Sequence, residues 1–585
     1  MTLRRIPRSL TPWANSLSNR AAISGPKVLT LPRLPIFEAL NSHQKSKSAI
    51  VHSSSGEVFT YGELLAATAW HKDWLLNLGK AEVKQDLEET RVAILVENGY
   101  DYVVSMLSVF AAGGIAVPLC TSHPTPEMRH VMSDSTPKLL LTSTKYCKKG
   151  GEVLESPELM YKCELEIITQ RIRKIRMLPY PDIRLVDVAW ADERKDRGAL
   201  IIYTSGTTGL PKGVVSTHSS LTAQSTSLVE AWEMSREDYL LHVLPLHHVH
   251  GIVNATLAPL FAGGTIEYLF PSTAESIWDR LTMKSRKPNG RYVMGKIRPR
   301  VNLFMAVPTV YNRLLAAFPT LSTTIQARGK HAVRSLRLAI SGSAALPGSI
   351  KDAWQALGRT KTGGGTMLER YGMTEIGMAL SQGLPLSDRM ANSVGWPLPG
   401  VEARLVDTET GKPIAAEETQ KEGEIQIRGK TVFREYWGKP EATRKEFVED
   451  ETGGKPWFKT GDVAVRDERG AYYIHGRSSV DIIKSGGEKV SALEVERELL
   501  ELPQISEAAV VALPDPDWGQ RVTAIIVLSE QGKEEAFGHE EMRKVMKERL
   551  ANYKVPTVTK IVDVLKRNQM GKINKKMLVK EVFEQ

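Results

Sequence analysis

A loop rich in glycine and hydroxyl side chains, residues 203–213, is the segment best suited to bind phosphate. It reads Tyr-Thr-Ser-Gly-Thr-Thr-Gly-Leu-Pro-Lys-Gly, so three glycines and four Ser/Thr hydroxyls lie close to Lys212. Backbone N–H groups, hydroxyls and an ammonium can together surround a phosphate. The spacing is not that of a Walker loop, because Gly-x-x-x-x-Gly-Lys-Ser/Thr does not occur here. The segment predicts a phosphate site; taken alone, a flexible surface loop is the alternative.

Six further motifs follow this loop along the chain. They are Pro-Leu-His-His-Val-His-Gly at 245–251, Ser-Gly-Ser-Ala-Ala-Leu-Pro at 341–347, Tyr-Gly-Met-Thr-Glu at 371–375, Phe-Lys-Thr-Gly-Asp at 458–462, Gly476-Arg477 with Asp481, and Asn-Gln-Met-Gly-Lys at 568–572. In this order the seven motifs resemble those of the adenylate-forming (AMP-binding) superfamily, which contains acyl-CoA synthetases, luciferases and the adenylation domains of peptide synthetases. The resemblance covers residues 36–580.

The resemblance implies a two-step reaction that uses ATP, Mg²⁺ and coenzyme A. A carboxylate attacks the α-phosphorus of ATP and releases pyrophosphate, and a thiol then displaces AMP from the acyl-adenylate. The implied nucleotide residues are Lys212 and Thr204, Ser205, Gly206, Thr207, Thr208 and Gly209 for the phosphates, Thr374 for the α-phosphate, Glu375 and Thr208 for Mg²⁺, Asp462 and Arg477 for the ribose, and Ser343, Ala344, Ala345 and Tyr371 for the adenine.

Lys572 is implied to bridge the acyl carboxylate and the α-phosphate, whereas most lysines near it are solvated surface residues. In this family the small C-terminal domain rotates between the two half-reactions. The resemblance puts the pivot at Ser478–Val480, although one extra residue between Arg477 and Asp481 leaves the hinge residue open. Gly486, Gly487 and Lys489 are then expected near coenzyme A.

Arg370 occupies the position that borders the acyl group, where relatives that activate monocarboxylates commonly carry glycine or alanine. An arginine facing a fatty acyl chain would be a costly unpaired charge. Facing a second carboxylate, it forms a bidentate pair. We expect His248, His250 and Ser343 to complete this acyl site. The alternative is a structural ion pair, for example with Glu369.

The residues of these motifs are similar to those of malonyl-CoA synthetases, in particular the mitochondrial acyl-CoA synthetase family member 3 type. This resemblance implies malonate, or else methylmalonate, as the acid. Two alternatives stay open: a ligase for a medium-chain or aromatic acid, and an adenylation module that loads a separate carrier protein. A catalytically dead binding protein would be expected to lack Lys212, Glu375, Asp462 or Lys572, and all four are present.

Alternating short apolar strands and helices predict parallel βαβ units over the first 340 residues. The expected strands are 91–96, 115–117, 138–141, 200–204, 239–243, 301–307 and 336–341, with helices at 100–112 and 126–133. After residue 396 the pattern predicts β-strands, including a hairpin across 467–470. We expect an α/β N-terminal domain over 36–477, made of parallel-sheet layers and a β-rich subdomain. A small mobile α/β domain is expected over 478–585.

Composition excludes several classes of protein. The chain has 42% apolar and 25% charged residues, as ordinary globular proteins do, and only three cysteines, too few for a disulfide-stapled fold. Tyr102–Cys120 is long enough to suggest a membrane span, but Gly113, Gly114 and Pro118 favour a buried helix followed by a strand. We therefore expect a soluble protein.

The net charge of +10 is concentrated in two segments and does not indicate nucleic-acid binding. Residues 1–37 carry six Lys/Arg and no acid, which leaves +4 for the rest. The first 35 residues have the composition of a mitochondrial transit peptide and predict a matrix location. The alternative is a basic tail on a cytosolic protein. Residues 284–300 hold seven Lys/Arg and are expected to form an exposed insertion loop.

Overall fold

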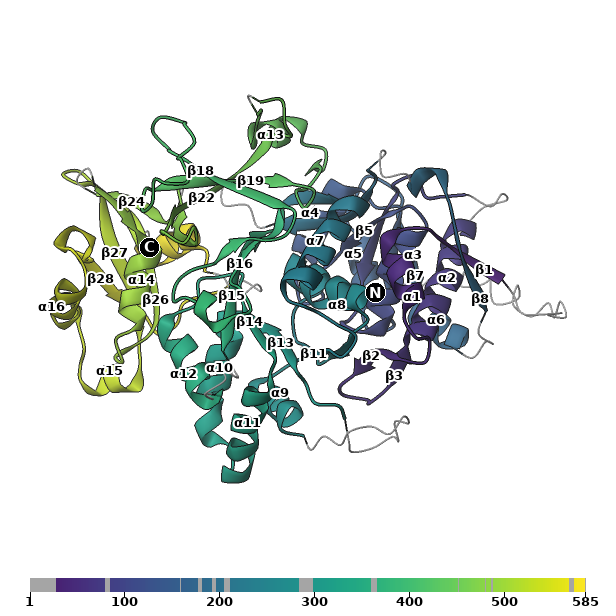
Figure 1. Ribbon diagram of the computed structural model, residues 1–585, viewed down its shortest axis with the longest axis horizontal. Coiled ribbons are helices and arrows are strands. Elements are labelled where there is room, and N and C mark those ends of the chain that lie inside the picture. The colour runs from purple at the N-terminus through teal and green to yellow at the C-terminus, as the bar shows by residue number, and fades with distance from the viewer. Residues whose placement is uncertain are drawn as a thin grey trace, which may run out of the picture.

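The computed structural model describes residues 28–78, 85–157, 159–176, 181–191, 196–204, 211–283, 298–358, 366–450, 452–478, 480–485, 488–567 and 573–583. Two large sheets lie at its centre, and a β-rich subdomain and a C-terminal domain lie on one side of them (Figure 1). This is the expected α/β architecture.

The first large sheet has seven strands in the order β20-β10-β9-β5-β4-β6-β7. Strands β4 to β7 and β9 pair in parallel, while β10 runs antiparallel to β9. The strand bounds are Arg91–Leu95 (β4), Ile115–Pro118 (β5), Leu139–Thr142 (β6), Glu164–Ile167 (β7), Gly198–Thr204 (β9), Lys212–Thr217 (β10) and Glu435–Tyr436 (β20). A small separate sheet pairs Val28–Pro32 (β1) with Asp182–Val186 (β8).

The second large sheet has nine strands in the order β17-β16-β15-β14-β13-β11-β12-β2-β3 and is parallel from β2 to β15. The bounds are Ser48–His52 (β2), Val58–Thr60 (β3), Tyr239–His242 (β11), Thr265–Tyr268 (β12), Leu303–Ala306 (β13), Leu338–Ser341 (β14), Met367–Met373 (β15), Gly377–Ser381 (β16) and Trp396–Pro397 (β17). Neighbouring residues pack into different cores: Leu240 on one face and Leu241 on the other. Helices therefore cover both faces, as parallel sheets require.

One core unites the two large sheets. It contains side chains of both sheets together with Tyr61–Asn77 (α2), Tyr100–Ala111 (α3) and His218–Ala231 (α7). Helix α2 begins at a capping box in which Thr60 and Glu63 exchange hydrogen bonds. On the other face of the nine-stranded sheet, Trp278 and Trp354 pack from Ala274–Thr282 (α9) and Gly348–Gly358 (α12). The other helices of this domain are Pro35–Ser42 (α1), Thr125–Ser135 (α4), Cys147–Leu154 (α5), Thr169–Arg176 (α6), Ala258–Ala262 (α8), Pro308–Ala317 (α10) and Thr323–Ser335 (α11).

The β-rich subdomain contains Val401–Val406 (β18), Gly423–Gly429 (β19), Phe447–Val448 (β21), Trp457–Arg466 (β22) and Tyr472–Arg477 (β23), with Pro440–Lys445 (α13). β22 and β23 form the expected hairpin. The C-terminal domain contains Ile482–Ser485 (β24), Glu488–Ser491 (β25), Ile505–Asp515 (β26), Gly519–Leu528 (β27) and Val558–Ile561 (β28), with Ala492–Leu500 (α14), Glu530–Glu534 (α15), His539–Arg549 (α16) and Lys575–Phe583 (α17). The backbone N–H of Ser349 in α12 donates to Glu501 across the two domains, at 2.9 Å.

One expectation from the sequence needs correction. Residues 1–27 of the expected transit segment lie outside the described residues, but residues 28–35 belong to the fold, and Leu29 and Leu31 of β1 are buried. Residues 298–300 of the expected insertion loop lie outside any helix or strand, and Arg298 anchors them through an ion pair of 2.6 Å with the fully buried Glu267. Residues 284–297 of that segment lie outside the described residues.

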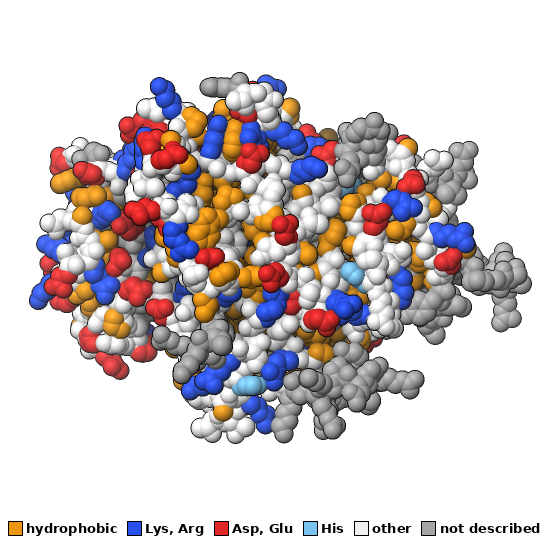
Figure 2. Space-filling model, viewed as in Figure 1, with side chains coloured by type: hydrophobic (Ala, Val, Ile, Leu, Met, Phe, Trp, Pro, Cys, Tyr) orange, Lys and Arg blue, Asp and Glu red, His pale blue; other side chains and the backbone are white. Residues whose placement is uncertain are grey.

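The exposed face in Figure 2 carries Lys/Arg and Asp/Glu side chains intermingled, rather than one continuous basic stripe. Within the described part of the chain, no helix combines the length and the apolar character needed to cross a membrane. The stretch from Tyr102 is the buried helix α3 followed by β5, as expected.

Candidate active site

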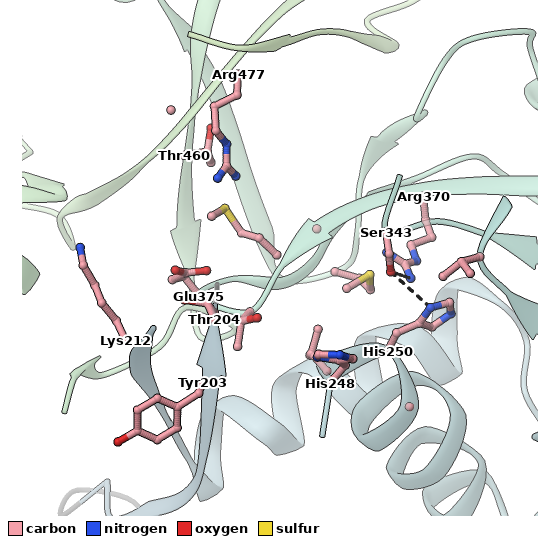
Figure 3. A pocket seen from close by; sticks show the side chains of 18 of the residues that line it. Tyr203, Thr204, Lys212, His248, His250, Ser343, Arg370, Glu375, Thr460 and Arg477 are labelled. Atoms are coloured by element: carbon pink, nitrogen blue, oxygen red, sulfur yellow. Dashed lines mark hydrogen bonds between the residues drawn. The ribbon is translucent and has the colours of Figure 1, made fainter. Parts of the chain in front are cut away.

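The site is a cavity of about 950 Å³ at the carboxyl ends of the parallel strands (Figure 3). Its wall includes residues at or just after the ends of five strands: Thr204 (β9), Val243 (β11), Val307 (β13), Ser343 (β14) and Met373 (β15). Ligands of open α/β sheets bind at this edge, where the connecting turns converge. Its volume lies near the upper end of the range found for small-molecule sites, about 300–1,000 Å³.

Lys212, Tyr436 and Glu375 define one end of the cavity. The Lys212 ammonium lies 4.6 Å from the centre of the Tyr436 ring, and the Tyr436 hydroxyl donates to Glu375 at 2.9 Å. Burial raises the pKa of Glu375 above its ordinary value. No lysine or arginine of the described residues lies within 4.0 Å of this carboxylate. A buried carboxylate and a lysine at the same end of a cavity suit a phosphate with its divalent cation.

Asp462 joins two residues at the side of the cavity. It accepts a hydrogen bond of 2.6 Å from the Tyr371 hydroxyl and one of 3.0 Å from Arg477 Nε. Burial alone would lower the pKa of Arg477, but the Asp462 carboxylate outweighs this effect and raises it. The three side chains therefore hold one another in place between β15, β22 and β23.

Arg370 lies at the opposite end of the cavity and is 4% exposed (Figure 3). Its Nη2 donates to Ser343 Oγ at 3.2 Å, but its Nε is buried without a hydrogen-bond partner among the described residues. Burial lowers its pKa, and no carboxylate of the described residues lies within 4.0 Å. Glu369, the alternative partner, instead pairs with Lys351 at 2.7 Å. The cavity therefore contains an arginine that has no counter-ion among the residues the structure describes.

Ser343 and His250 extend this cationic end. Ser343 Oγ lies 3.4 Å from His250 Nδ1, and the buried His250 Nε2 has no hydrogen-bond partner in the described part of the chain. Burial, followed by the charge of Arg370, holds the pKa of His250 far below its ordinary value, so the ring is neutral. Ser343 has a φ of +72°, a conformation that serine rarely adopts and that is found disproportionately at ligand sites. An arginine, a hydroxyl and a neutral imidazole in this arrangement could together bind an anionic group.

The remaining expected site residues fall into three groups. Thr374 and His248 line the cavity. Ala344 and Ala345 are exposed beside it, and Lys489 pairs at 2.9 Å with Glu409 of the β-rich subdomain rather than lining it. Those outside the described residues are Ser205, Gly206, Thr207, Thr208, Gly209, Gly486, Gly487 and Lys572, together with Ser479 of the expected hinge.

Sequence reasoning missed Tyr436 and Arg567. Tyr436 reaches the site because β20 pairs with β10 across more than 200 residues, which no local pattern reveals. Arg567 lines the cavity from the C-terminal domain. The Gly-Lys motif that begins at the next residue was the only signal that this segment approaches the site.

The model of the AMP-binding enzyme family matches residues 37–437, and the model of its C-terminal domain matches 494–572. The chain belongs to the AMP-binding enzymes. A CoA ligase of Gibberella moniliformis is 46% identical over 95% of this chain and 96% of its own length. The human mitochondrial malonate–CoA ligase ACSF3 is 41% identical over 85% of this chain and 83% of its own length.

Among solved structures, ATP-bound MatB of Rhodopseudomonas palustris is 30% identical and superposes with a TM-score of 0.77. The match covers 93% of this chain and 97% of that one. The family and the fold expected from the seven motifs are thus confirmed.

Proposed function

We propose that this chain is an ATP-dependent malonate–CoA ligase that forms malonyl-CoA, AMP and pyrophosphate. The observation that carries the proposal is Arg370, a buried guanidinium at one end of the cavity that has no counter-ion in the described part of the chain. The distal carboxylate of malonate would supply that counter-ion through a charge-assisted pair. The human relative at 41% identity is named a malonate–CoA ligase, which supports this substrate.

In the first half-reaction one carboxylate oxygen of malonate attacks the α-phosphorus, and the bond to pyrophosphate breaks. Lys212 and Lys572 would neutralise the negative charge that builds on the phosphates, with Thr374 donating to the α-phosphate. In the second half-reaction the sulfur of coenzyme A attacks the acyl carbon, and AMP leaves. We assign Asp462 and Arg477 to the ribose, and Ser343 to Ala345 with Tyr371 to the adenine side.

Arg370, His250, Ser343 and His248 would hold the distal carboxylate while the proximal one reacts. A monocarboxylate cannot neutralise Arg370, so its binding would leave a buried charge unpaired. The same geometry admits methylmalonate, which carries the same two carboxylates.

Mg²⁺ fits the carboxylate of Glu375, with Thr208 as a further oxygen ligand; when bound, it would neutralise phosphate charge. We also propose that the C-terminal domain rotates about Ser478–Val480 between the half-reactions, which would bring Gly486, Gly487 and Lys489 toward coenzyme A.

We propose a mitochondrial location, which rests on the basic, acid-free composition of residues 1–27 and on the mitochondrial human relative.

The test is pyrophosphate release by the purified full-length protein with a panel of acids, with and without coenzyme A. We expect malonate to give the highest kcat/KM, with methylmalonate next and acetate, butyrate, octanoate and benzoate far behind. A preference for octanoate or benzoate would contradict the substrate assignment. Pyrophosphate release without any thioester product would instead support an adenylation module.

A further inference from the structure

A cluster of one cysteine and two histidines lies outside the residues assigned to the ligase reaction. Cys120, His123 and His247 each offer one ligand atom, and these three atoms lie within 4.8 Å of one another. Cys120 and His123 belong to the loop between β5 and α4, whereas His247 follows β11. The three residues therefore come from both large sheets, and residues 124 positions apart in the sequence are brought together.

His123 is held in an orientation that suits metal binding. Its Nδ1 lies 3.2 Å from the carboxylate of Glu127, one turn further along the chain in α4. With Nδ1 held by Glu127, a metal would bind at Nε2. Histidine ligands in metal sites commonly use their second nitrogen in such a hydrogen bond to a carboxylate, which fixes the ring and increases its basicity.

His247 supplies an independent sign of a ligand site. Its Nε2 is buried and has no hydrogen-bond partner among the described residues. A buried polar atom without a partner costs free energy, and a metal ion would satisfy it. The His247 ring lies 5.5 Å from the His123 ring, centre to centre. The thiol of Cys120, a residue only 4% exposed, completes the group.

The ligand types select the metal. One thiolate and two neutral imidazoles favour zinc over the hard cations Mg²⁺ and Ca²⁺, which prefer oxygen. Zinc bonds of about 2.0–2.3 Å require ligand atoms about 3.5 Å apart, so the side chains would close in by about 1 Å around the ion. Three protein ligands leave the fourth tetrahedral position to water.

We propose that Cys120, His123 and His247 bind one Zn²⁺, which joins the two large sheets beside the acyl end of the cavity. The ring of His247 lies 3.9 Å from that of His248, which lines the cavity. The ion would fix the segment 245–251 that carries His248 and His250. This role does not depend on which acid the enzyme activates.

The test starts from metal-stripped full-length protein titrated with Zn²⁺, with bound metal measured by elemental analysis after gel filtration. We expect about one Zn²⁺ per chain in the wild type and in Cys147→Ser, a cysteine variant outside the cluster. Cys120→Ser and His247→Gln should lose most of it. Glu127→Gln, which changes only a half-exposed orienting carboxylate, should weaken zinc affinity about 10- to 100-fold. Zinc should also raise the apparent Tm of the wild type, and chelation should reverse this.

Co²⁺ substitution keeps the test decisive even if Cys120→Ser does not fold. Co²⁺ bound to the wild type should give the thiolate-to-cobalt charge-transfer absorption of a tetrahedral site. Absence of this absorption, or of stoichiometric zinc in the wild type, would overturn the proposal. Equal zinc affinity of Cys120→Ser and Cys147→Ser would do the same.

Discussion

Gly342 gives Arg370 the space that its position requires. A methyl group on Gly342 would lie within 3.0 Å of three guanidinium atoms. The backbone conformation does not require a glycine at this position, because the φ of Gly342 lies outside the left-handed region. The loop after β14 thus lets the guanidinium lie against its backbone, directed at Ser343.

Gly342→Ala should therefore act through Arg370. Overpacking costs about 1–3 kcal/mol, so kcat/KM for malonate should fall about tenfold as the guanidinium is displaced. In an Arg370→Ala background the same change should have little effect, because the guanidinium that the new methyl group would contact is absent. The measurement is the double-mutant cycle on kcat/KM. Additive effects of the two changes would argue against this contact.

Glu375 should set the acid side of the pH profile. Burial raises its pKa, and the Arg477 charge and the Tyr436 hydroxyl only partly oppose this. The carboxylate, the form that can hold a cation, is lost as pH falls through this raised pKa. As the pH is lowered, activity should therefore begin to fall at a pH above the pKa of an ordinary glutamate. Because Mg²⁺ would bind the ionised form, more Mg²⁺ should shift the acid limb of kcat/KM to lower pH. An acid limb independent of Mg²⁺ concentration would contradict this role.

At the residue scale, a motif in the sequence predicted the buried charge of Arg370. The residues that surround its guanidinium could not be predicted. The choice between a ligand and an ion pair with Glu369 depended on Lys351, whose position in α12 could not be inferred from the sequence. Gly342 looked like one more glycine of a turn. Its role follows from a side chain 28 positions away in the sequence.

At the scale of elements, strand β15 serves two purposes because its side chains alternate. Glu369 points toward α12, where Lys351 donates to it at 2.7 Å, and Arg370 points into the cavity. Both members of the Lys351–Glu369 pair are buried. The pair thus connects α12 to β15 at the residue before Arg370.

Lys351→Met should destabilise the protein, because it leaves Glu369 buried without its partner. Loss of one member of such a pair costs about 3–5 kcal/mol, seen as a lower apparent Tm. Lys351→Met combined with Glu369→Gln should recover part of the loss. The matched control is Lys330→Met on the exposed side of α11, expected to change stability by less than about 0.5 kcal/mol. Equal effects of Lys351→Met and Lys330→Met would remove the structural role of the pair.

Seven of the sixteen strands in the two large sheets could be predicted from short apolar runs, and their bounds agree to within a few residues. Elements defined by long-range contacts could not. β20 has two residues and exists through its pairing with β10, and the π-helical turns at His250–Leu257 are concealed in an apolar segment. Both contribute to the cavity wall, since Tyr436 and His250 lie in them.

At the scale of the whole molecule, the fold begins earlier than the composition of the N-terminus suggested. Besides the pairing of β1 with β8, Lys72 of α2 donates to the carbonyl of Thr30 at 2.8 Å. The basic, acid-free composition extends to residue 37, whereas the burial of Leu29 and Leu31 shows that the folded part begins earlier. Charge alone could not separate these two segments.

A protein that starts at Val28 should keep the full apparent Tm and activity, whereas one that starts at Pro35 should lose stability. The shorter protein lacks β1 and two buried leucines, each worth about 1.5–3 kcal/mol. Thermal unfolding of the two proteins side by side checks this. Equal Tm values would mean that β1 adds nothing to the fold.

The central claim, that Arg370 selects a second carboxylate, is tested most directly by kcat/KM of wild type and Arg370→Ala for malonate and butyrate. Truncation of one member of a buried charge pair costs about 2–5 kcal/mol, roughly 30- to 5,000-fold for malonate. Activity with butyrate should fall much less or rise, and Arg370→Lys should restore little, because an ammonium lacks the planar fork. An equal loss for malonate and butyrate would contradict the account and assign Arg370 to the nucleotide side of the cavity instead.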